Sequence, residues 1–244
     1  MDDPDLLASL AVEAGRVADV DPDSLDRPVP WTDSWTVGEV VGHLGEIHRW
    51  ATALCTEPGS TIRRRDLEPA PGGPAVVSWY AAGLAPMLSA FEGTSPDTVV
   101  HTWAGWQPRR WWLRRLAHET ALHRWDVEAA GTGAHATRGF AAPFAVDGID
   151  ELFDNFVPLV GDRSVGRGET MHVHAVDADG EWHLTFGDPG IEIERTHARA
   201  DVALRGPAAD LLLLLWNRTS PDTTAVELIG DRALLGLWRR TVQF

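Results

Sequence analysis

The sequence contains no lysine, a single cysteine and no long hydrophobic run. Because Cys55 is the only cysteine, the chain cannot form an internal disulfide, and this favours the reducing cytoplasm. The longest apolar run, Leu211 to Trp216, is far shorter than the roughly 20 residues that a membrane helix requires. The N-terminal stretch MDDPDLLASL is acidic where a signal peptide would be basic. We therefore expect a soluble cytoplasmic protein without a membrane partner.

Positive charge is scarce as well. The chain has 21 basic residues, all arginine, against 36 acidic ones, which gives a net charge of −15. This balance repels a phosphate backbone, so we expect no nucleic-acid partner. A hydrophobic content of 44% and a charged content of 23% are typical of a globular protein. A length of 244 residues allows two domains of ordinary size.

The first half of the chain has apolar residues at helical spacing. It predicts four helices, over residues 2–20, 37–57, 74–92 and 108–130. The second helix has the clearest start, because Thr36 and Glu39 can form a capping box, and Pro86 should kink the third. The connection 56–73 is long and polar, and its Arg63-Arg64-Arg65 run could meet an anion, although so short a basic run is usually solvated. Four helices of this length predict a bundle.

The second half predicts a mixture of strands and helices. The expected elements are a helix at 143–159, a hairpin of strands 170–176 and 181–187, strands at 191–196 and 201–204, a helix at 208–218, a strand at 225–229 and a helix at 231–242. The predicted fold class is therefore a four-helix bundle, residues 1–138, followed by a small α+β domain, residues 139–244.

The helix expected at 108–130 carries polar groups on its apolar stripe. Glu119 and His123 lie four residues apart on this stripe and are therefore neighbours on one face. A buried carboxylate without a partner costs several kcal/mol, and a divalent cation would remove that cost. His43 on the second helix supplies a third ligand. Zinc suits two histidines and one carboxylate with an open fourth position, and iron(II) uses the same three ligands. The alternative to a metal site is an ion pair between Glu119 and His123 without a metal.

Two further groups of residues are weaker candidates. Asp126, three residues after His123, could orient its imidazole, although a solvated position fits as well. His172 and His174 alternate on one expected strand, and His183 should fall opposite His174 across the hairpin. A second metal site could be formed there, but a polar outer face of the hairpin explains the same pattern.

Three motifs together resemble the mycothiol-dependent maleylpyruvate isomerase family over nearly the whole chain. They are WTVGEVVGHL at 35–44, HETALHRWD at 118–126 and RGPAADLLLLLWNR at 205–218. The resemblance implies a DinB-like four-helix bundle that binds zinc through two histidines and a glutamate, at the positions of His43, Glu119 and His123. It also implies a sterol-carrier-like α+β domain that closes over the site, and an arginine for substrate or thiol at the position of Arg218.

The function implied by this resemblance is that of an enzyme that uses zinc and mycothiol. Coordination would turn the thiol into a thiolate, and the enzyme would act as an isomerase or S-transferase on a small electrophile such as maleylpyruvate. Two alternatives remain open. One is a non-catalytic protein that binds a small ligand and uses the metal as a staple, and the other is a metal-dependent hydrolase. The sequence is compatible with a monomer or a homodimer.

Overall fold

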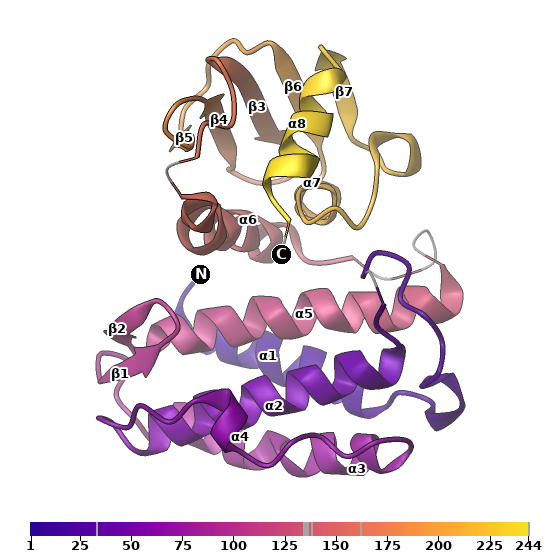
Figure 1. Ribbon diagram of the computed structural model, residues 1–244, viewed down its shortest axis with the longest axis vertical. Coiled ribbons are helices and arrows are strands. Elements are labelled where there is room, and N and C mark those ends of the chain that lie inside the picture. The colour runs from indigo at the N-terminus through magenta and orange to yellow at the C-terminus, as the bar shows by residue number, and fades with distance from the viewer. Residues whose placement is uncertain (33, 134–136, 138, 162, 244) are drawn as a thin grey trace. The chain divides into compact units, whose positions relative to one another are not determined.

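Figure 1 shows the computed structural model, which describes residues 1–32, 34–133, 137, 139–161 and 163–243. The chain forms two compact units, Met1–Arg138 and Gly139–Phe244. The first unit is mainly helical and the second combines a sheet with helices, which confirms the predicted fold class. The assignments of the two as DinB-like and sterol-carrier-like stay predictions. Within the described ranges, no helix combines the length and apolar character needed to cross a membrane.

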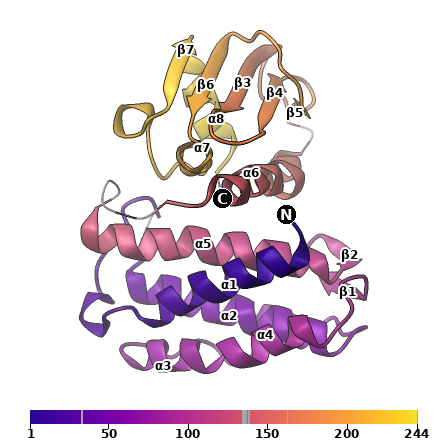
Figure 2. The same cartoon turned by 180° about the vertical axis from the view of Figure 1, so that it is seen from behind.

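The helices of the first unit surround one apolar core. They are α1 (Asp3–Ala18), α2 (Val37–Thr56), α3 (Ala75–Ala82), α4 (Leu84–Glu92) and α5 (Arg110–Thr132). Both α1 and α2 contact α5 on one side and the α3–α4 pair on the other (Figures 1 and 2). Leu10, Leu44, Leu54, Met87 and Leu116 are completely buried between them. The amphipathic stripes of the sequence therefore meet in the interior of a bundle.

The third predicted helix is broken into α3 and α4 at Gly83. The break lies three residues before Pro86, whose ring clashes with the carbonyl group four residues earlier and removes one helical hydrogen-bond donor. The proline therefore has a stronger effect than the kink that the sequence predicted.

A short hairpin precedes α5 and was absent from the predicted elements. It pairs β1 (Val99–Thr102) with β2 (Gly105–Pro108) in antiparallel register. The Thr102 hydroxyl accepts the amide of Ala104 and donates to the carbonyl of Gly105, whose φ of 91° favours glycine. Because β2 includes Pro108, α5 begins at Arg110 and not at residue 108.

The second unit is built on a five-stranded mixed sheet. Its strands are β3 (Glu169–Ala175), β4 (Glu181–Phe186), β5 (Ile191–Glu194), β6 (Val202–Gly206) and β7 (Glu227–Gly230), in the order β5-β4-β3-β6-β7. The central pair β3 and β6 is parallel and the other neighbours are antiparallel. The helices are α6 (Ala142–Glu151), continued by a π-helical turn at Leu152–Phe156, α7 (Ala208–Leu215) and α8 (Ala233–Thr241).

The two faces of this sheet differ in chemistry. Met171, Val173 and Leu184 are fully buried on the face that α7 contacts, whereas His172, His174 and Glu181 lie on the opposite face. The predicted register of the hairpin was wrong: His183 pairs with His172, and Glu181 pairs with His174. The amide of Ala175 bonds the carbonyl of Gly180, so the loop length places each β4 residue two positions away from the expected partner.

The start of α2 agrees with the predicted capping box. The Thr36 hydroxyl accepts the amide of Glu39 at 3.3 Å, and a Glu39 carboxylate oxygen accepts the amide of Thr36 at 2.7 Å. Two amides at the helix terminus, which have no partner within the helix, are thereby satisfied.

Replacing Thr36 should weaken this helix start. We expect Thr36→Ala to lower the free energy of unfolding by about 1 kcal/mol, because the capping oxygen is lost. Thr36→Ser keeps the hydroxyl and should stay close to the wild type. Urea unfolding followed by circular dichroism measures both variants, and equal stability of the two would contradict a stabilising cap.

Candidate functional site

Three residues predicted as metal ligands lie together inside the first unit. His43 on α2 places its Nε2 2.8 Å from Oε1 of Glu119 on α5. The Nε2 of His123, one turn further along α5, is 3.5 Å from the same oxygen. One ligand atom from each residue lies within 4.8 Å of the other two. The structure thus brings the predicted trio together, while its role in metal binding stays a prediction.

The spacing of α5 explains how one helix supplies most of this cluster. Arg115, Glu119 and His123 follow one another at intervals of four residues and occupy one face of the helix. Arg115 donates to Oε2 of Glu119 at 2.5 Å, while Oε1 faces the two histidines. The two carboxylate oxygens therefore have different partners, and only one of them faces the imidazoles.

A second carboxylate fixes the orientation of His123. Asp126 is completely buried, and its Oδ2 lies 2.9 Å from Nδ1 of His123. Its other oxygen accepts the indole N–H of Trp31 at 2.5 Å. Nδ1 of His123 is thereby engaged by Asp126, and its Nε2 is left facing Glu119. Trp35 covers the cluster, with its ring centroid 4.7 Å from that of His43 and 6.0 Å from that of His123.

The charges in this cluster are strongly coupled. Burial alone would raise the pKa of Glu119, but Arg115 and the two histidines hold it well below its ordinary value. Burial alone would lower the pKa of His123, but Asp126 and Glu119 raise it to about 9. At neutral pH the cluster without metal therefore holds an imidazolium between two carboxylates. Because a metal ligand must be deprotonated, a cation would replace this proton.

The neighbouring histidine of α2 behaves differently. Burial lowers the pKa of His48 to about 3, and its Nε2 lies 2.8 Å from the hydroxyl of Thr120. His48 is therefore a neutral core residue, outside the group formed by His43, Glu119 and His123.

Some residues around the trio were missed in the sequence. Arg115 could have been found, because it lies four residues before Glu119 on the same helical face. Trp31 could not, because it is brought to Asp126 from a loop. The arginines of the Arg63-Arg64-Arg65 run have different partners. Arg63 forms an ion pair with Asp66, whereas Nη1 of Arg64 lies 3.3 Å from Nδ1 of His43.

Arg218, predicted to contact substrate or thiol, lies in the second unit after α7. Its guanidinium donates to the carbonyl of Trp216 at 2.9 Å and lies over the ring of the same residue, 5.6 Å from the centroid. Its functional role stays a prediction.

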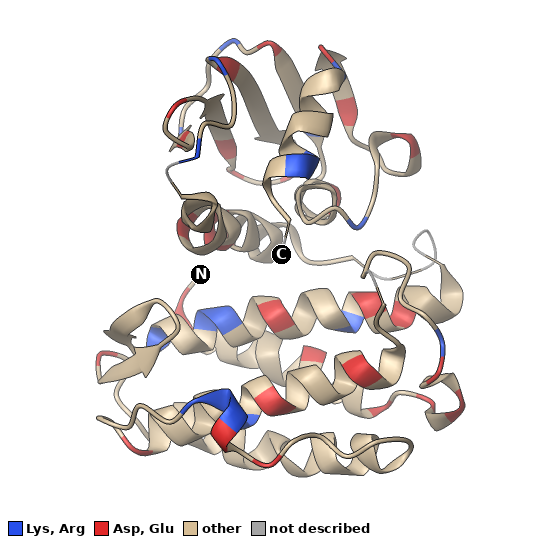
Figure 3. Ribbon diagram, viewed as in Figure 1, with Lys and Arg blue, Asp and Glu red and all other residues tan. Residues whose placement is uncertain are grey.

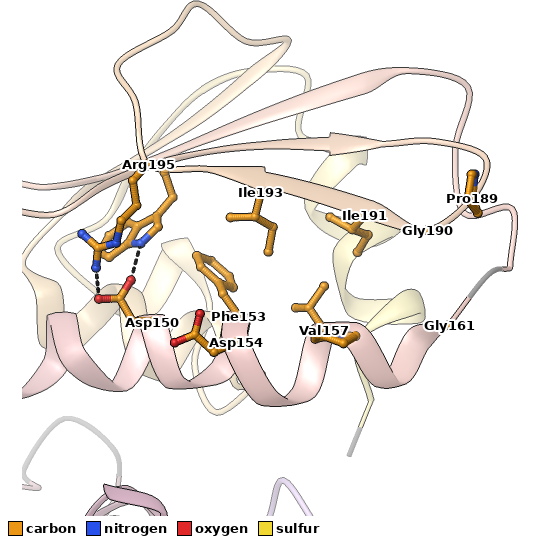
Figure 4. A pocket seen from close by; sticks show the side chains of 12 residues that line it. Asp150, Phe153, Asp154, Val157, Gly161, Pro189, Gly190, Ile191, Ile193 and Arg195 are labelled. Carbon is orange, nitrogen blue, oxygen red and sulfur yellow. Dashed lines mark hydrogen bonds and ion pairs between the residues drawn. The ribbon is translucent and has the colours of Figure 1, made fainter. Parts of the chain in front are cut away.

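The second unit also contains a pocket of about 750 Å³. Figure 4 shows Phe153 and Val157 facing Ile191 and Ile193 of β5 across it. At one end of the pocket, Asp150 accepts a hydrogen bond from the indole N–H of Trp182 and forms an ion pair with Arg195. Asp150, Asp154 and Arg195 are the charged residues of the lining. The volume is within the range of small-molecule sites, but none of the predicted site residues lines this pocket.

Cys55 near the end of α2 is completely buried. Burial raises the pKa of its thiol to about 12, so the sulfur is protonated at neutral pH. A protonated, buried thiol is a poor nucleophile, which argues against a catalytic role for Cys55.

Comparisons with known proteins agree with this architecture of a helical bundle joined to an α+β unit. The model described as the mycothiol maleylpyruvate isomerase N-terminal domain matches residues 6–128, and that of the C-terminal domain of the same family matches residues 143–237. The chain therefore belongs to the mycothiol maleylpyruvate isomerase family. A search of curated proteins gave no match.

Solved structures give the same fold. The chain is similar to a crystal structure of the mycothiol-dependent maleylpyruvate isomerase, with a TM-score of 0.61, 13% identity and 93% of each chain covered. It is equally similar to a histidine-to-alanine mutant of that isomerase, with a TM-score of 0.60, 14% identity and 93% of each chain covered. At this identity the likeness concerns the fold.

The raised pKa of His123 predicts how the stability of the metal-free protein depends on pH. The folded state keeps a proton up to about pH 9 that an unfolded histidine loses near pH 6.5. The contribution of this proton to the free energy of unfolding is therefore complete below about pH 6.5 and is lost as the pH rises through about 9. Between these values the free energy of unfolding should fall by at most about 1.4 kcal/mol per pH unit. Urea unfolding with a chelator present, over about pH 6 to 10, measures this slope.

His123→Gln should abolish the slope. The matched control is His48→Gln, which should preserve the slope between about pH 7.5 and 9, because in that window His48 is neutral in both the folded and the unfolded state. A slope that persists in His123→Gln would assign the pH dependence to another group.

Proposed function

We propose that this protein is a zinc- and mycothiol-dependent enzyme that isomerises a small cis-unsaturated electrophile such as maleylpyruvate, by reversible addition of the thiol, or transfers the thiol to it. The observation that carries the proposal is the partly buried group His43, Glu119 and His123 in a member of this family. Mycothiol and maleylpyruvate come from the name of the family and of the similar solved structures.

The donor atoms suit a zinc ion. Two imidazole nitrogens and one carboxylate oxygen are a set that catalytic zinc sites use, with a fourth position left for water or substrate. Arg115 binds the remaining oxygen of Glu119, so one carboxylate oxygen stays available to the cation. Iron(II) accepts the same donors, and metal analysis distinguishes the two.

Each surrounding residue has a task in this proposal. Zinc bound here would lower the pKa of a coordinated thiol, so that the thiol becomes a thiolate at neutral pH. Asp126 holds the proton on Nδ1 of His123 and so leaves Nε2 as the ligand. Arg115 keeps Glu119 ionised, and Trp35 shields the imidazoles from water on the side it covers.

The pocket of the second unit favours one alternative. With about 750 Å³ of space between residues 150–158 and β5, a small apolar ligand could bind there, and a metal in the bundle would then serve only stability. In that case the metal would be retained without any thiol-dependent turnover.

Removing a ligand should remove both metal and activity. We expect His43→Ala and Glu119→Gln each to lose one equivalent of zinc relative to the wild type. Turnover of maleylpyruvate with mycothiol should fall by at least about 100-fold, because a metal contributes several kcal/mol to the transition state. Elemental analysis and a turnover assay on the same samples measure the two effects.

The matched control for this experiment is His48→Gln, on the same helix and bonded to Thr120, which should keep its zinc and its turnover. Unchanged zinc content in both ligand variants would remove the basis of the proposal. Turnover without added thiol would identify a hydrolase, and zinc without turnover would identify the binding protein.

Asp126→Asn should weaken metal binding without removing a ligand. The amide is less able to hold the Nδ1 proton of His123, so we expect zinc affinity to fall by about 10–100-fold. A competition titration with a chelating dye measures the affinity. Glu128→Gln is the control, because Glu128 lies on the same helix but pairs with Arg16 and Arg124. Equal affinities of the two variants would contradict an orienting role for Asp126.

A further inference from the structure

A second group of metal-ligating side chains lies on the open face of the sheet in the second unit. It consists of His172 and His174 on β3, Glu181 on β4 and His197 on the segment between β5 and β6. One ligand atom from each of the four lies within 4.8 Å of those of the others. We propose that these four residues bind a divalent transition-metal ion, with zinc as the best fit, and that the ion fastens the segment between β5 and β6 to the sheet.

The carboxylate of Glu181 is the centre of this group. Its Oε1 lies 2.5 Å from Nδ1 of His174 and 3.1 Å from Nδ1 of His197. Two imidazoles from different parts of the chain thus converge on one oxygen. The ring of His172 completes the cluster, with its centroid 5.0 Å from that of His197 and 5.8 Å from that of His174.

His172 provides an independent indication of a ligand. The residue is only 7% exposed, and its Nε2 is buried without a hydrogen-bond partner among the described residues. A buried polar nitrogen without a partner costs free energy, which makes it unusual in a stable fold. The imidazole therefore keeps a ring nitrogen available, although it lies beside two other histidines and a carboxylate.

The topology explains why His197 reaches this place. In the strand order β5-β4-β3-β6-β7, the chain that leaves β5 must pass β4 and β3 before it enters β6. His197 lies on that crossing segment, and its ring contacts those of His172 and His174, so the segment passes over the histidine face. The side chain of His197 is nevertheless 74% exposed. A metal bond would fix a segment that has few buried contacts of its own.

The surrounding charges admit a cation. Glu194 lies opposite His183 in the β4–β5 ladder, beside the cluster, and adds a second carboxylate to this face of the sheet. Arg205 lies opposite His174 in the β3–β6 ladder. Its guanidinium is 3.9 Å from the carboxylate of Glu227, which offsets its positive charge. The protein as a whole is strongly acidic, with a net charge of −15 (Figure 3 shows the charged residues). These features favour retention of a divalent ion.

The ligand set also determines the kind of site. Three imidazole nitrogens and one carboxylate oxygen complete the four positions of tetrahedral zinc, whereas the trio in the bundle leaves one position open. A closed set is typical of structural sites. This proposal is independent of the proposed enzymatic function and would stand if that function were wrong.

Zinc stoichiometry of the full-length protein tests the site. After equilibration with zinc and removal of unbound metal, we expect His197→Ala to hold one equivalent less than the wild type. His183→Ala is the matched control, because His183 pairs with His172 in the sheet but lies outside the cluster. It should hold as much zinc as the wild type. Because His197 is exposed, its replacement should leave the fold intact, which circular dichroism checks.

Trypsin digestion gives a second readout, because Arg195 and Arg199 flank His197. Zinc should slow cleavage after Arg199 several-fold in the wild type and in His43→Ala, but not in His197→Ala. Equal zinc content in His197→Ala and His183→Ala would overturn the proposal, and so would cleavage that zinc does not slow in the wild type. If the metal site in the helical bundle were absent instead, His43→Ala would retain as much zinc as the wild type. The experiment therefore distinguishes an error in this proposal from an error in the proposed function.

Discussion

The ionised carboxylate of Glu119, largely enclosed between α2 and α5, is the constraint on which the interior of the first unit depends. An isolated charge in such a place would be strongly unfavourable, so its partners must be supplied with good geometry. Arg115 and His123 come from the same helix, one turn away on either side, and His43 comes from α2. Packing of α2 against α5 is thus coupled to the neutralisation of one charge.

Those parts of the molecule that follow helical spacing could be predicted from the sequence. The start of α2 and the meeting of Glu119 with His123 depend on intervals of three and four residues, which the chain displays directly. His43 was placed correctly beside them because the apolar stripe of α2 fixes the direction of its side chain. The resemblance of the motifs to the family then predicted zinc binding at these positions.

Other parts depend on information that is not local. Strands of four residues, as in β1 and β2, are too short to show an alternating pattern, so this hairpin was missed. The pairing of His183 depends on the length of a loop, and one wrong loop length shifts every pair in the ladder. His197 reaches the other histidines only through the crossing from β5 to β6, which becomes visible once the strand order is known.

The burial of Cys55 has a consequence for the proposed function, in which the enzyme would handle an electrophile. A reagent that accepts a small thiol would also alkylate any accessible thiolate on the polypeptide. Here the chain's single sulfhydryl is enclosed in the bundle and stays un-ionised at neutral pH. With no lysine in the chain either, neither a cysteine thiolate nor a lysine amine of the protein would compete for such a substrate. In the proposed function, this sulfur would therefore not limit the working life of the enzyme through alkylation by its own substrate.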